Sequence, residues 1–351
     1  MTLARHVITS VTTTDLAYQY LRSVGRNSFR GYHGSGGKQT VYVVETDRGA
    51  IGWGLPLYDG NPGQLVGRNV ADLIDPARGV IEPAAEFLDY PLHDLAARIL
   101  EVPVYALLGS AGSTRVRCYS GGIYFDDLDA GIDAIRANLQ QDYDFGFRDF
   151  KLKVGRGHRW MKTQPGLERD IEVTRLTREL YPEAGVLVDA NDGFTVNGLM
   201  DYLDGVEDCG LYWIEEPFAE RRDDLQALGE RLATMQLRPK VADGEFDPDE
   251  EHVLRLASEG LVDVALMDVT GHGLTAWRRT MPRLVEANAE ASPHAWGQPL
   301  KTLYAAHLAA GLGNVPIIEG VPGTTAGLND YTLEDGYVVL SDEPGFGIKL
   351  P

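Results

Sequence analysis

Two lysines stand two residues apart in the stretch DFKLKVG, which begins at residue 149. In a β-strand, Lys151 and Lys153 would point to one face and the apolar residues beside them to the other, because strand side chains alternate. Two neighbouring ammonium groups disfavour each other's charge, and a nearby metal ion adds to this effect, so we expect a lowered lysine pKa. Lys153 is therefore a candidate base near neutral pH. An amphipathic strand with a solvated polar face is the alternative interpretation.

Three carboxylates, Asp189, Glu215 and Glu245, end three successive β-rich runs of the chain. Oxygen donors without cysteine or clustered histidine suit a hard divalent cation, and Mg²⁺ fits best. Each acid alone could be a surface residue at a strand end. Together, on adjacent strands, they predict a metal site.

Asp268 and His294 end two neighbouring β-rich runs further along the chain. A carboxylate beside an imidazole orients the ring and favours its charged form, so the pair predicts a second general acid or base. Strand order places this pair across the barrel mouth from the lysines. A histidine with a purely structural role is the alternative. Glu319 ends the last run and brings one more acid to the same place.

These residues require a scaffold that brings many strand ends together. Eight β-rich runs alternate with longer helical patterns such as 167–180, 224–235 and 275–288. The eight runs lie at 114–120, 149–154, 185–190, 211–216, 239–245, 263–268, 291–296 and 315–320. This alternation predicts an α/β fold, a (β/α)₈ TIM-type barrel over residues 113–320, with its active site at the C-terminal ends of the strands. Barrel interiors are normally apolar, so the converging charges must neutralise one another or hold an ion.

The flanking segments differ from the barrel pattern. Residues 1–112 predict an α+β domain, and the turn-rich segment 321–351 is expected to pack back on it. Residues 22–38 contain five glycines and no hydrophobic periodicity, which predicts a long mobile loop acting as a lid. Polar side chains that suit a polyhydroxylated substrate are Arg22, Arg26, Asn27, Arg30, Tyr32 and His33 in this loop, with Tyr58, Asp59 and Asn61 in a second stretch. A solvated loop without ligand contacts is the alternative.

The composition narrows the class of protein. The 351 residues are 44% hydrophobic and carry a net charge of −20, which disfavours nucleic-acid and anionic membrane surfaces as partners. Cys118 and Cys209 are too few for a disulfide framework. No apolar run is long enough for a membrane span or a signal peptide, so we expect a cytoplasmic protein. We expect a homo-oligomer as the assembly.

The chain resembles the enolase superfamily, and within it the mandelate racemase subgroup. The resemblance spans nearly all of the predicted barrel, and the first domain and the tail look like the family's capping domain. The matching motifs, in order, are KLK (151–153), VDAN (188–191), WIEEP (213–217), DGEF (243–246), MDVTGHG (267–273), SPHAWG (292–297) and IIEG (317–320).

The resemblance implies a role for each of these site residues. Lys153 would be the base on one face of the substrate, with Lys151 as its electrostatic neighbour, and His294 with Asp268 would act on the other face. Asp189, Glu215 and Glu245 would bind one Mg²⁺, with Glu216 and Asp243 as the less favoured members of their pairs. Glu319 would hydrogen-bond the substrate carboxylate and Asn191 would be an auxiliary contact near the metal.

The implied chemistry is removal of the proton α to a carboxylate, through an enediolate. A divalent ion and hydrogen-bond donors stabilise the developing charge of that species. Loss of a β-hydroxyl would make the protein a sugar-acid dehydratase, our preferred function, whereas a lactone cycloisomerase or a racemase/epimerase would use the same residues. A metal-dependent hydrolase is disfavoured because the chain has no His-x-His pair. A non-catalytic barrel would be expected to lack at least one of these groups.

Overall fold

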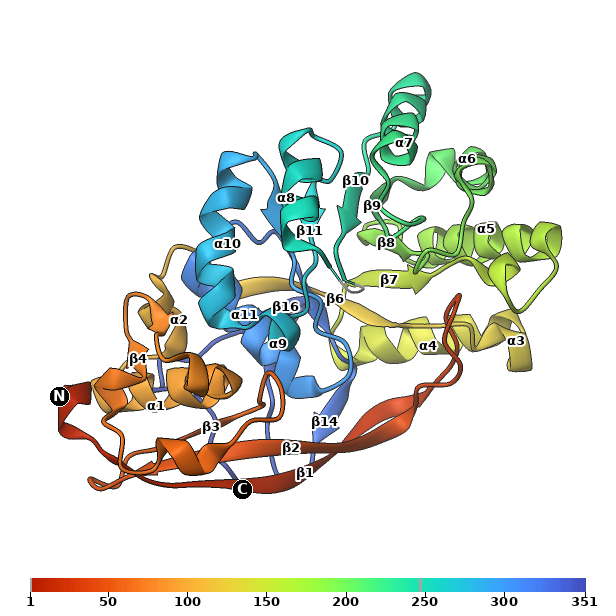
Figure 1. The fold of residues 1–351 in the computed structure, drawn as a ribbon. Coiled ribbons are helices and arrows are strands. Elements are labelled where there is room, and N and C mark those ends of the chain that lie inside the picture. Colours follow the sequence, from red (N-terminus) through yellow and green to blue (C-terminus); the bar gives the residue numbers. More distant parts are fainter. Residues whose placement is uncertain (1, 246–247) are drawn as a thin grey trace.

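A barrel of eight strands forms the centre of the molecule (Figure 1). The computed structural model describes residues 2–245 and 248–351, so Phe246 of the DGEF motif lies outside the described residues. The barrel strands are β6 (Arg115–Ile123), β7 (Asp149–Lys153), β8 (Val186–Asp189), β9 (Leu211–Glu215), β10 (Lys240–Asp243), β11 (Val264–Ala265), β12 (Glu290–Ala291) and β13 (Ile318–Gly320). They pair in parallel in sequence order from β6 to β12, and β13 pairs with β6. Each of the eight predicted runs contains strand residues, although the run 291–296 overlaps β12 at Ala291 alone.

Two hydrogen bonds between the region of β12 and the residues that precede β13 close the barrel. The Ala291 amide donates to the Asn314 carbonyl at 3.0 Å, and the Ser292 hydroxyl donates to the Ile317 carbonyl at 2.8 Å. The β13 strand leads directly into the short strand β14 (Gly323–Thr325), so the eighth strand is followed by another strand. The barrel-type fold is confirmed, with this one difference from a strict eightfold repeat.

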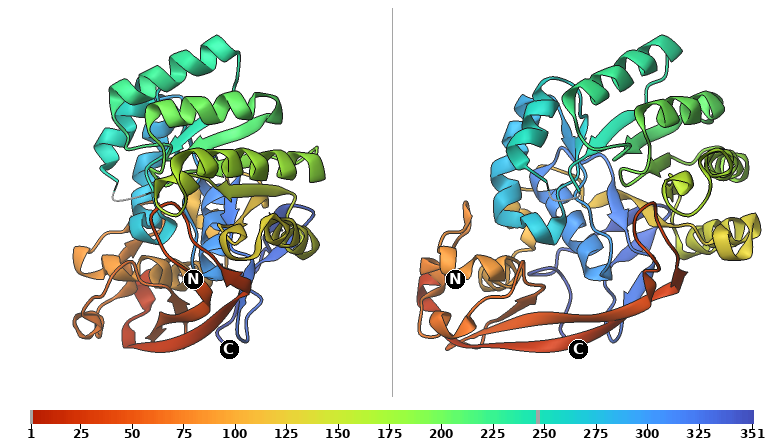
Figure 2. Two further views of the ribbon diagram at one scale, coloured as in Figure 1. Left: turned by 90° about the vertical axis from the view of Figure 1, so that its right-hand side faces the viewer. Right: turned by 45° about the vertical axis from the view of Figure 1, so that its right-hand side comes forward.

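Helices cover the outside of the barrel (Figures 1 and 2). They are α3 (Asp127–Ala130), α4 (Ile132–Phe145), α5 (Thr163–Leu180), α6 (Val196–Gly205), α7 (Arg222–Met235), α8 (Glu250–Ser258), α9 (Val269–His272), α10 (Leu274–Glu286) and α11 (Pro299–Leu312). The helices α5, α7 and α10 confirm the three predicted ones to within a few residues at each end. Their apolar faces pack against outward-pointing strand residues such as Phe150 and Leu152, which are fully buried.

An antiparallel sheet and a small helical region form the N-terminal capping domain. The sheet runs in the order β14, β1 (Ile8–Val24), β2 (Gly34–Thr46), β3 (Ile51–Gly54). The rest of the domain contains β4 (Ile74–Asp75), β5 (Gly79–Val80), α1 (Asp89–Leu100) and α2 (Val104–Leu108). The short 3₁₀ turns of this domain are η1 (Leu3–Arg5), η2 (Pro62–Leu65), η3 (Val70–Asp72) and η4 (Pro83–Leu88). Two more lie between barrel elements, η5 (Arg156–His158) after β7 and η6 (Glu207–Cys209) after α6.

The C-terminal segment returns to both parts of the molecule. The β14 strand pairs with β1 through Tyr18 and Thr325. The hairpin of β15 (Thr332–Glu334) and β16 (Tyr337–Val339) instead adds antiparallel to β6, with Val338 opposite Val116. This segment therefore joins the capping sheet to the first barrel strand.

The predicted loop at 22–38 is shorter than expected. Residues 22–24 belong to β1 and residues 34–38 belong to β2, which leaves 25–33 as the connection. Glycine allows this pairing at Gly36, whose φ is +145° and where a Cβ atom would lie 2.2 Å from the Tyr18 carbonyl oxygen. The interpretation of the glycine-rich half as a loop is wrong, because close strand approach, rather than mobility, requires those glycines.

The buried His307 of α11 makes the stability of the fold dependent on pH. Burial lowers its pKa to about 3, and its Nδ1 accepts the Tyr105 amide at 3.3 Å, so the ring is neutral in the folded protein. An unfolded histidine takes up its proton near pH 6.5, so this contribution is complete above that pH and is lost as the pH falls towards 3. We expect this residue to lower the free energy of unfolding by about 2 kcal/mol between pH 7.5 and pH 5.

Urea unfolding at the two pH values would measure this effect. A His307→Gln variant should show a smaller loss between pH 7.5 and pH 5, while a His158→Gln variant, at an exposed position, should behave like the unmodified protein. An equal pH dependence in the His307→Gln variant would contradict the prediction.

Candidate active site

Three carboxylates meet at the C-terminal ends of β8, β9 and β10. Asp189 and Glu215 are paired residues on adjacent strands, and Glu245 follows β10. One oxygen of each acid lies within 4.8 Å of the others. Asp189 and Glu215 are fully buried, and Glu245 Oε2 is buried without a hydrogen-bond partner. Three converging oxygen donors with a buried unsatisfied atom fit a hard divalent cation such as Mg²⁺.

Lys151 and Lys153 both point into the barrel, as the alternation of β7 predicts. Lys151 Nζ lies 2.6 Å from Glu215 Oε1, 2.9 Å from Glu319 Oε1 and 3.3 Å from Asp189 Oδ2. Lys153 Nζ makes an ion pair with Asp189 Oδ2. The solvated-strand alternative is wrong, since both lysines are almost completely buried.

The predicted lowering of the lysine pKa values is not produced by the protein's own charges. Burial alone would lower the pKa of Lys153, and Lys151 adds to this effect, but Asp189 with the nearby glutamates raises the pKa above its ordinary value. The pKa of Lys151 is raised further, because Glu215 and Glu319 outweigh the cost of burial. The expectation considered the two lysines and a metal ion without the carboxylates of the neighbouring strands.

His294 faces the carboxylates from the other side of the site. Its Nδ1 donates to Asp268 Oδ2 at 2.8 Å, and its Nε2 lies 3.2 Å from Glu245 Oε1 and 3.7 Å from Glu319 Oε2. Burial would lower the pKa of His294, but Glu245, Glu319 and Asp268 raise it above its ordinary value. The ring can therefore carry a proton at Nε2, the atom that faces the site.

Glu319 lies between the two basic groups. Besides Lys151, it accepts the Ala295 amide at 2.8 Å through Oε2. Burial would raise its pKa, but Lys151 and His294 lower it below the ordinary value. Gly121 leaves the space that Glu319 occupies, since a Cβ atom there would lie 2.4 Å from Glu319 Oε1. The structure thus places Glu319 in the cluster despite the 25 residues that separate it from His294.

The lysine and the histidine approach different members of the carboxylate triad. Lys153, at the end of β7, contacts Asp189, whereas His294, after β12, contacts Glu245. Two groups able to hold or release a proton therefore flank the carboxylates from opposite sides. Such an arrangement can remove a proton from one face of a bound molecule and deliver a proton elsewhere on it.

Asn191 and the less favoured acids lie next to the triad. The Asn191 amide N–H donates to Asp189 Oδ1 at 3.0 Å, its side chain donates to Glu216 at 3.3 Å, and its Oδ1 is buried without a hydrogen-bond partner. Asp243 Oδ1 accepts the Gly244 amide at 2.7 Å. Burial raises the pKa of both Glu216 and Asp243 well above the ordinary range, which favours their neutral forms.

The loop 25–33 packs over the ends of the barrel strands (Figure 2). Ser28 donates to the Asn191 carbonyl at 2.8 Å, and the Phe125 amide donates to the Arg26 carbonyl at 2.9 Å. The His33 ring lies 4.6 Å from the ring of Tyr124, between centroids. The loop is thus placed at the barrel mouth, and its role as a mobile lid stays a prediction.

The four residues of this region that are predicted to contact the substrate have different surroundings from one another. Arg22 pairs with Asp142 of α4 at 2.5 Å and donates to the Gly122 carbonyl. Arg26 and Tyr32 both bind Asp129 near the surface. The charge of Lys153 acts on His33. Burial, with Lys153 and Arg30, lowers the pKa of His33 to about 4, although its Nδ1 bonds the Gly25 carbonyl. Substrate contact by these four residues stays a prediction.

Two site residues escaped the sequence analysis. Lys301 of α11 lies 2.8 Å from Asp268, and the indole of Trp213 donates to Glu215 at 3.0 Å. Trp213 belongs to the WIEEP motif and alternates with Glu215 on β9, so its inward direction was available from the strand pattern. No local pattern marks Lys301, which stands seven residues after the histidine that it neighbours.

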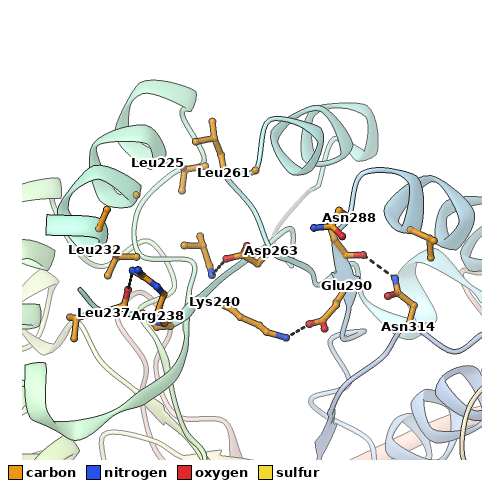
Figure 3. Close-up of a pocket in the computed structure, with 17 residues that line it drawn as sticks. Leu225, Leu232, Leu237, Arg238, Lys240, Leu261, Asp263, Asn288, Glu290 and Asn314 are labelled. Atoms are coloured by element: carbon orange, nitrogen blue, oxygen red, sulfur yellow. Dashed lines mark hydrogen bonds and ion pairs between the residues drawn. The ribbon is translucent and has the colours of Figure 1, made fainter. Parts of the chain in front are cut away.

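A cavity without any of the site residues lies where the strands β10, β11 and β12 begin, and Figure 3 shows the residues that line it. It measures about 600 Å³ and is lined at the starts of β10, β11 and β12 by Lys240, Asp263 and Glu290. Lys240 and Glu290 form an ion pair across it. In barrels of this type this end contributes to stability and the other end carries the chemistry, so we place the active site at the charged cluster.

Comparisons with known proteins agree with this geometry. Residues 134–351 match the family model described as enolase C-terminal domain-like. The solved galacturonate dehydratase from Geobacillus sp., complexed with D-galacturonate and 5-keto-4-deoxy-D-galacturonate, is 30% identical with a TM-score of 0.92, over 98% of this chain and 94% of that one. A mutant of that dehydratase complexed with Mg is 29% identical with a TM-score of 0.93, over 98% and 93% of the two chains.

One curated relative is named for a reaction other than dehydration. D-galactarolactone cycloisomerase from Agrobacterium fabrum is 26% identical over 343 residues, which cover 88% of this chain and 87% of that protein.

Among the helices of residues 2–245 and 248–351, none has the length and hydrophobicity needed to cross a membrane. The extent of the family match and the shared fold lead to one conclusion: this chain is an enzyme of the enolase superfamily, in its mandelate racemase and muconate lactonizing subgroup.

Proposed function

We propose that the protein is a Mg²⁺-dependent dehydratase of sugar acids. The observation that carries this proposal is the opposed placement of two proton-transfer groups, Lys153 on Asp189 and His294 on Glu245. Asp189, Glu215 and Glu245 would hold the ion. When bound, Mg²⁺ would supply a Lewis acid that stabilises negative charge developing on the substrate carboxylate.

The chain's own residues would move two protons. Lys153, in its neutral form, would take the proton from the carbon α to the carboxylate. This neutral form is favoured where a divalent ion on the triad offsets the carboxylate charge that raises the pKa of Lys153. The electron pair of that C–H bond would form the new Cα–Cβ double bond. His294 would give its Nε2 proton to the β-hydroxyl, which would leave as water, while Asp268 holds the ring through Nδ1. The resulting enol would tautomerise to a 2-keto-3-deoxy acid, so the overall reaction loses one water and needs no oxidant.

Screening sugar acids with Mg²⁺ would test the proposal. The panel would contain aldonates, aldarates and uronates, with D-galacturonate first because the 30% identical Geobacillus enzyme binds it. We expect one group of acids to lose one water, measured by mass spectrometry, and to gain a keto group on the carbon α to the carboxylate. This carbon is C2 in aldonates and aldarates and C5 in hexuronates such as D-galacturonate. Turnover of none of the acids, together with no exchange of any α-proton in D₂O, would refute the proposal.

A cycloisomerase is the second candidate, because of the match to D-galactarolactone cycloisomerase. It would use the same two groups, but its product would have the mass of its substrate. Sugar lactones belong in the same screen for this reason. A racemase or epimerase would be recognised by deuterium incorporation without any change in the carbon skeleton.

The neutral His33 provides a test of the loop. Because its Nδ1 bonds the Gly25 carbonyl, its Nε2 is left as an acceptor for a substrate hydroxyl. We expect His33→Ala to raise KM about tenfold with a smaller change in kcat, since it removes binding without touching the proton-transfer groups. His158→Ala, at an exposed position outside the loop, is the control. An unchanged KM in His33→Ala would remove His33 from the substrate contacts.

A further inference from the structure

Lys301 occupies an unusual position for a cation. It stands in the first turn of α11, where the partial positive charge of the helix N-terminus disfavours a positive side chain. It is the only Asp, Glu, Lys or Arg of this helix, and its side chain is 13% exposed. The helix otherwise buries Thr302 to Gly311 without interruption. A charge placed here requires a compensating partner.

Asp268 is that partner, and it is shared with His294. Lys301 Nζ and His294 Nδ1 both lie 2.8 Å from the same oxygen, Asp268 Oδ2. The other oxygen accepts the amides of Thr270 and Gly271 at 2.8 and 2.7 Å and the Thr270 hydroxyl at 2.9 Å. Burial would raise the pKa of Asp268, but Lys301 and His294 bring it below its usual range, so the carboxylate remains ionised and holds both donors.

These contacts close the segment 294–301 into a loop whose two ends meet on one carboxylate oxygen. The segment carries other parts of the site between its ends. The Ala295 amide donates to Glu319. The Trp296 ring stacks with Tyr20 at 5.5 Å between centroids and lies tilted against Tyr124 at 5.1 Å. Release of one end would therefore loosen the imidazole and the contact to Glu319 together.

We propose that Lys301 is a positioning residue, which fixes His294 for proton transfer by tying the end of the segment 294–301 to Asp268. This inference rests on the proposed function, in which His294 is the acid. It goes further by assigning a task to Lys301. The ion pair described for this lysine is with Asp268, which is not a member of the carboxylate triad.

Kinetics of Lys301 variants would test the catalytic part. We expect Lys301→Met to lower kcat about 10- to 100-fold with KM changed less than about threefold, because a misplaced acid slows the reaction without weakening substrate binding. Lys301→Arg keeps the charge and should restore most of the loss. Lys240→Met, which breaks a lysine–glutamate pair at the far end of the barrel, should leave both constants unchanged. Wild-type kcat in Lys301→Met, or no recovery in Lys301→Arg, would overturn the proposal.

Amide hydrogen exchange tests the same idea without a substrate. In the Mg²⁺-loaded protein, peptides covering 294–301 should exchange faster in Lys301→Met than in the unmodified protein, with Lys301→Arg and Lys240→Met unchanged. Unchanged exchange in Lys301→Met would overturn the positioning role whatever the substrate is. Failure of the unmodified enzyme to turn over any sugar acid would overturn the proposed function instead.

Discussion

Replacement of Lys153 by alanine should abolish turnover of the sugar acid and exchange of its α-proton with solvent. General bases contribute roughly 10²- to 10⁴-fold to rates. Among the described residues 2–245 and 248–351, the other base that pairs with Asp189 is Lys151, which Glu215 and Glu319 also engage. The expected loss of kcat is therefore about 10²- to 10⁴-fold. Product formation by mass spectrometry and deuterium incorporation by NMR would measure the two effects.

The His294→Asn variant should separate the two proton transfers. It retains Lys153, so the α-proton should still exchange with D₂O, while water loss should fall by a similar factor because the acid is missing. Lys240→Met serves as the matched control, since it removes a lysine from an ion pair outside the site. Full activity in both the Lys153→Ala and the His294→Asn variant would show that the acid and base assignments are wrong. Exchange lost in His294→Asn but kept in Lys153→Ala would reverse the two roles.

The carboxylate triad should be responsible for Mg²⁺ binding. An Asp189→Asn, Glu215→Gln double variant keeps the side-chain shapes but removes two negative charges from the three converging acids. We expect titration calorimetry to detect Mg²⁺ binding to the unmodified protein and none to the double variant at the same concentrations. Because a ligand that binds only the folded state stabilises it, 100 times the Kd of Mg²⁺ should add about 2.7 kcal/mol to the free energy of unfolding.

Asp243→Asn is the matched control for this experiment. Asp243 is buried beside the triad, and its pKa is raised by burial and by neighbouring acids, so the neutral amide resembles its native form. Its Mg²⁺ affinity should stay close to that of the unmodified protein. Unchanged binding in the Asp189→Asn, Glu215→Gln variant would refute the metal site. A strong loss in Asp243→Asn alone would move the ion towards the neighbouring acids.

The sequence by itself determined the barrel and the direction of most site residues. Strand alternation is local, so DFKLKVG was enough to predict that Lys151 and Lys153 share the inner face. The β/α rhythm then predicted which strand ends meet, and adjacent strands bring Asp189 beside Glu215. These predictions succeeded because each depends on a short stretch of chain and on the single closed geometry of a barrel.

Only the tertiary structure decided the features that depend on distances between remote residues. The pKa of Lys151 rises because Glu215 and Glu319 lie within 3 Å of its Nζ, and the pKa of Lys153 rises because of Asp189. A pKa thus depends on charges from several strands. The glycines of β2 pair with β1, although their composition predicts a loop, because backbone approach is a property of the partner strand. Lys301 contacts Asp268, which is 33 residues earlier in the chain, because the start of α11 lies near Asp268 at the start of α9. No periodicity encodes a contact between two elements whose relative position is fixed by packing of the whole barrel.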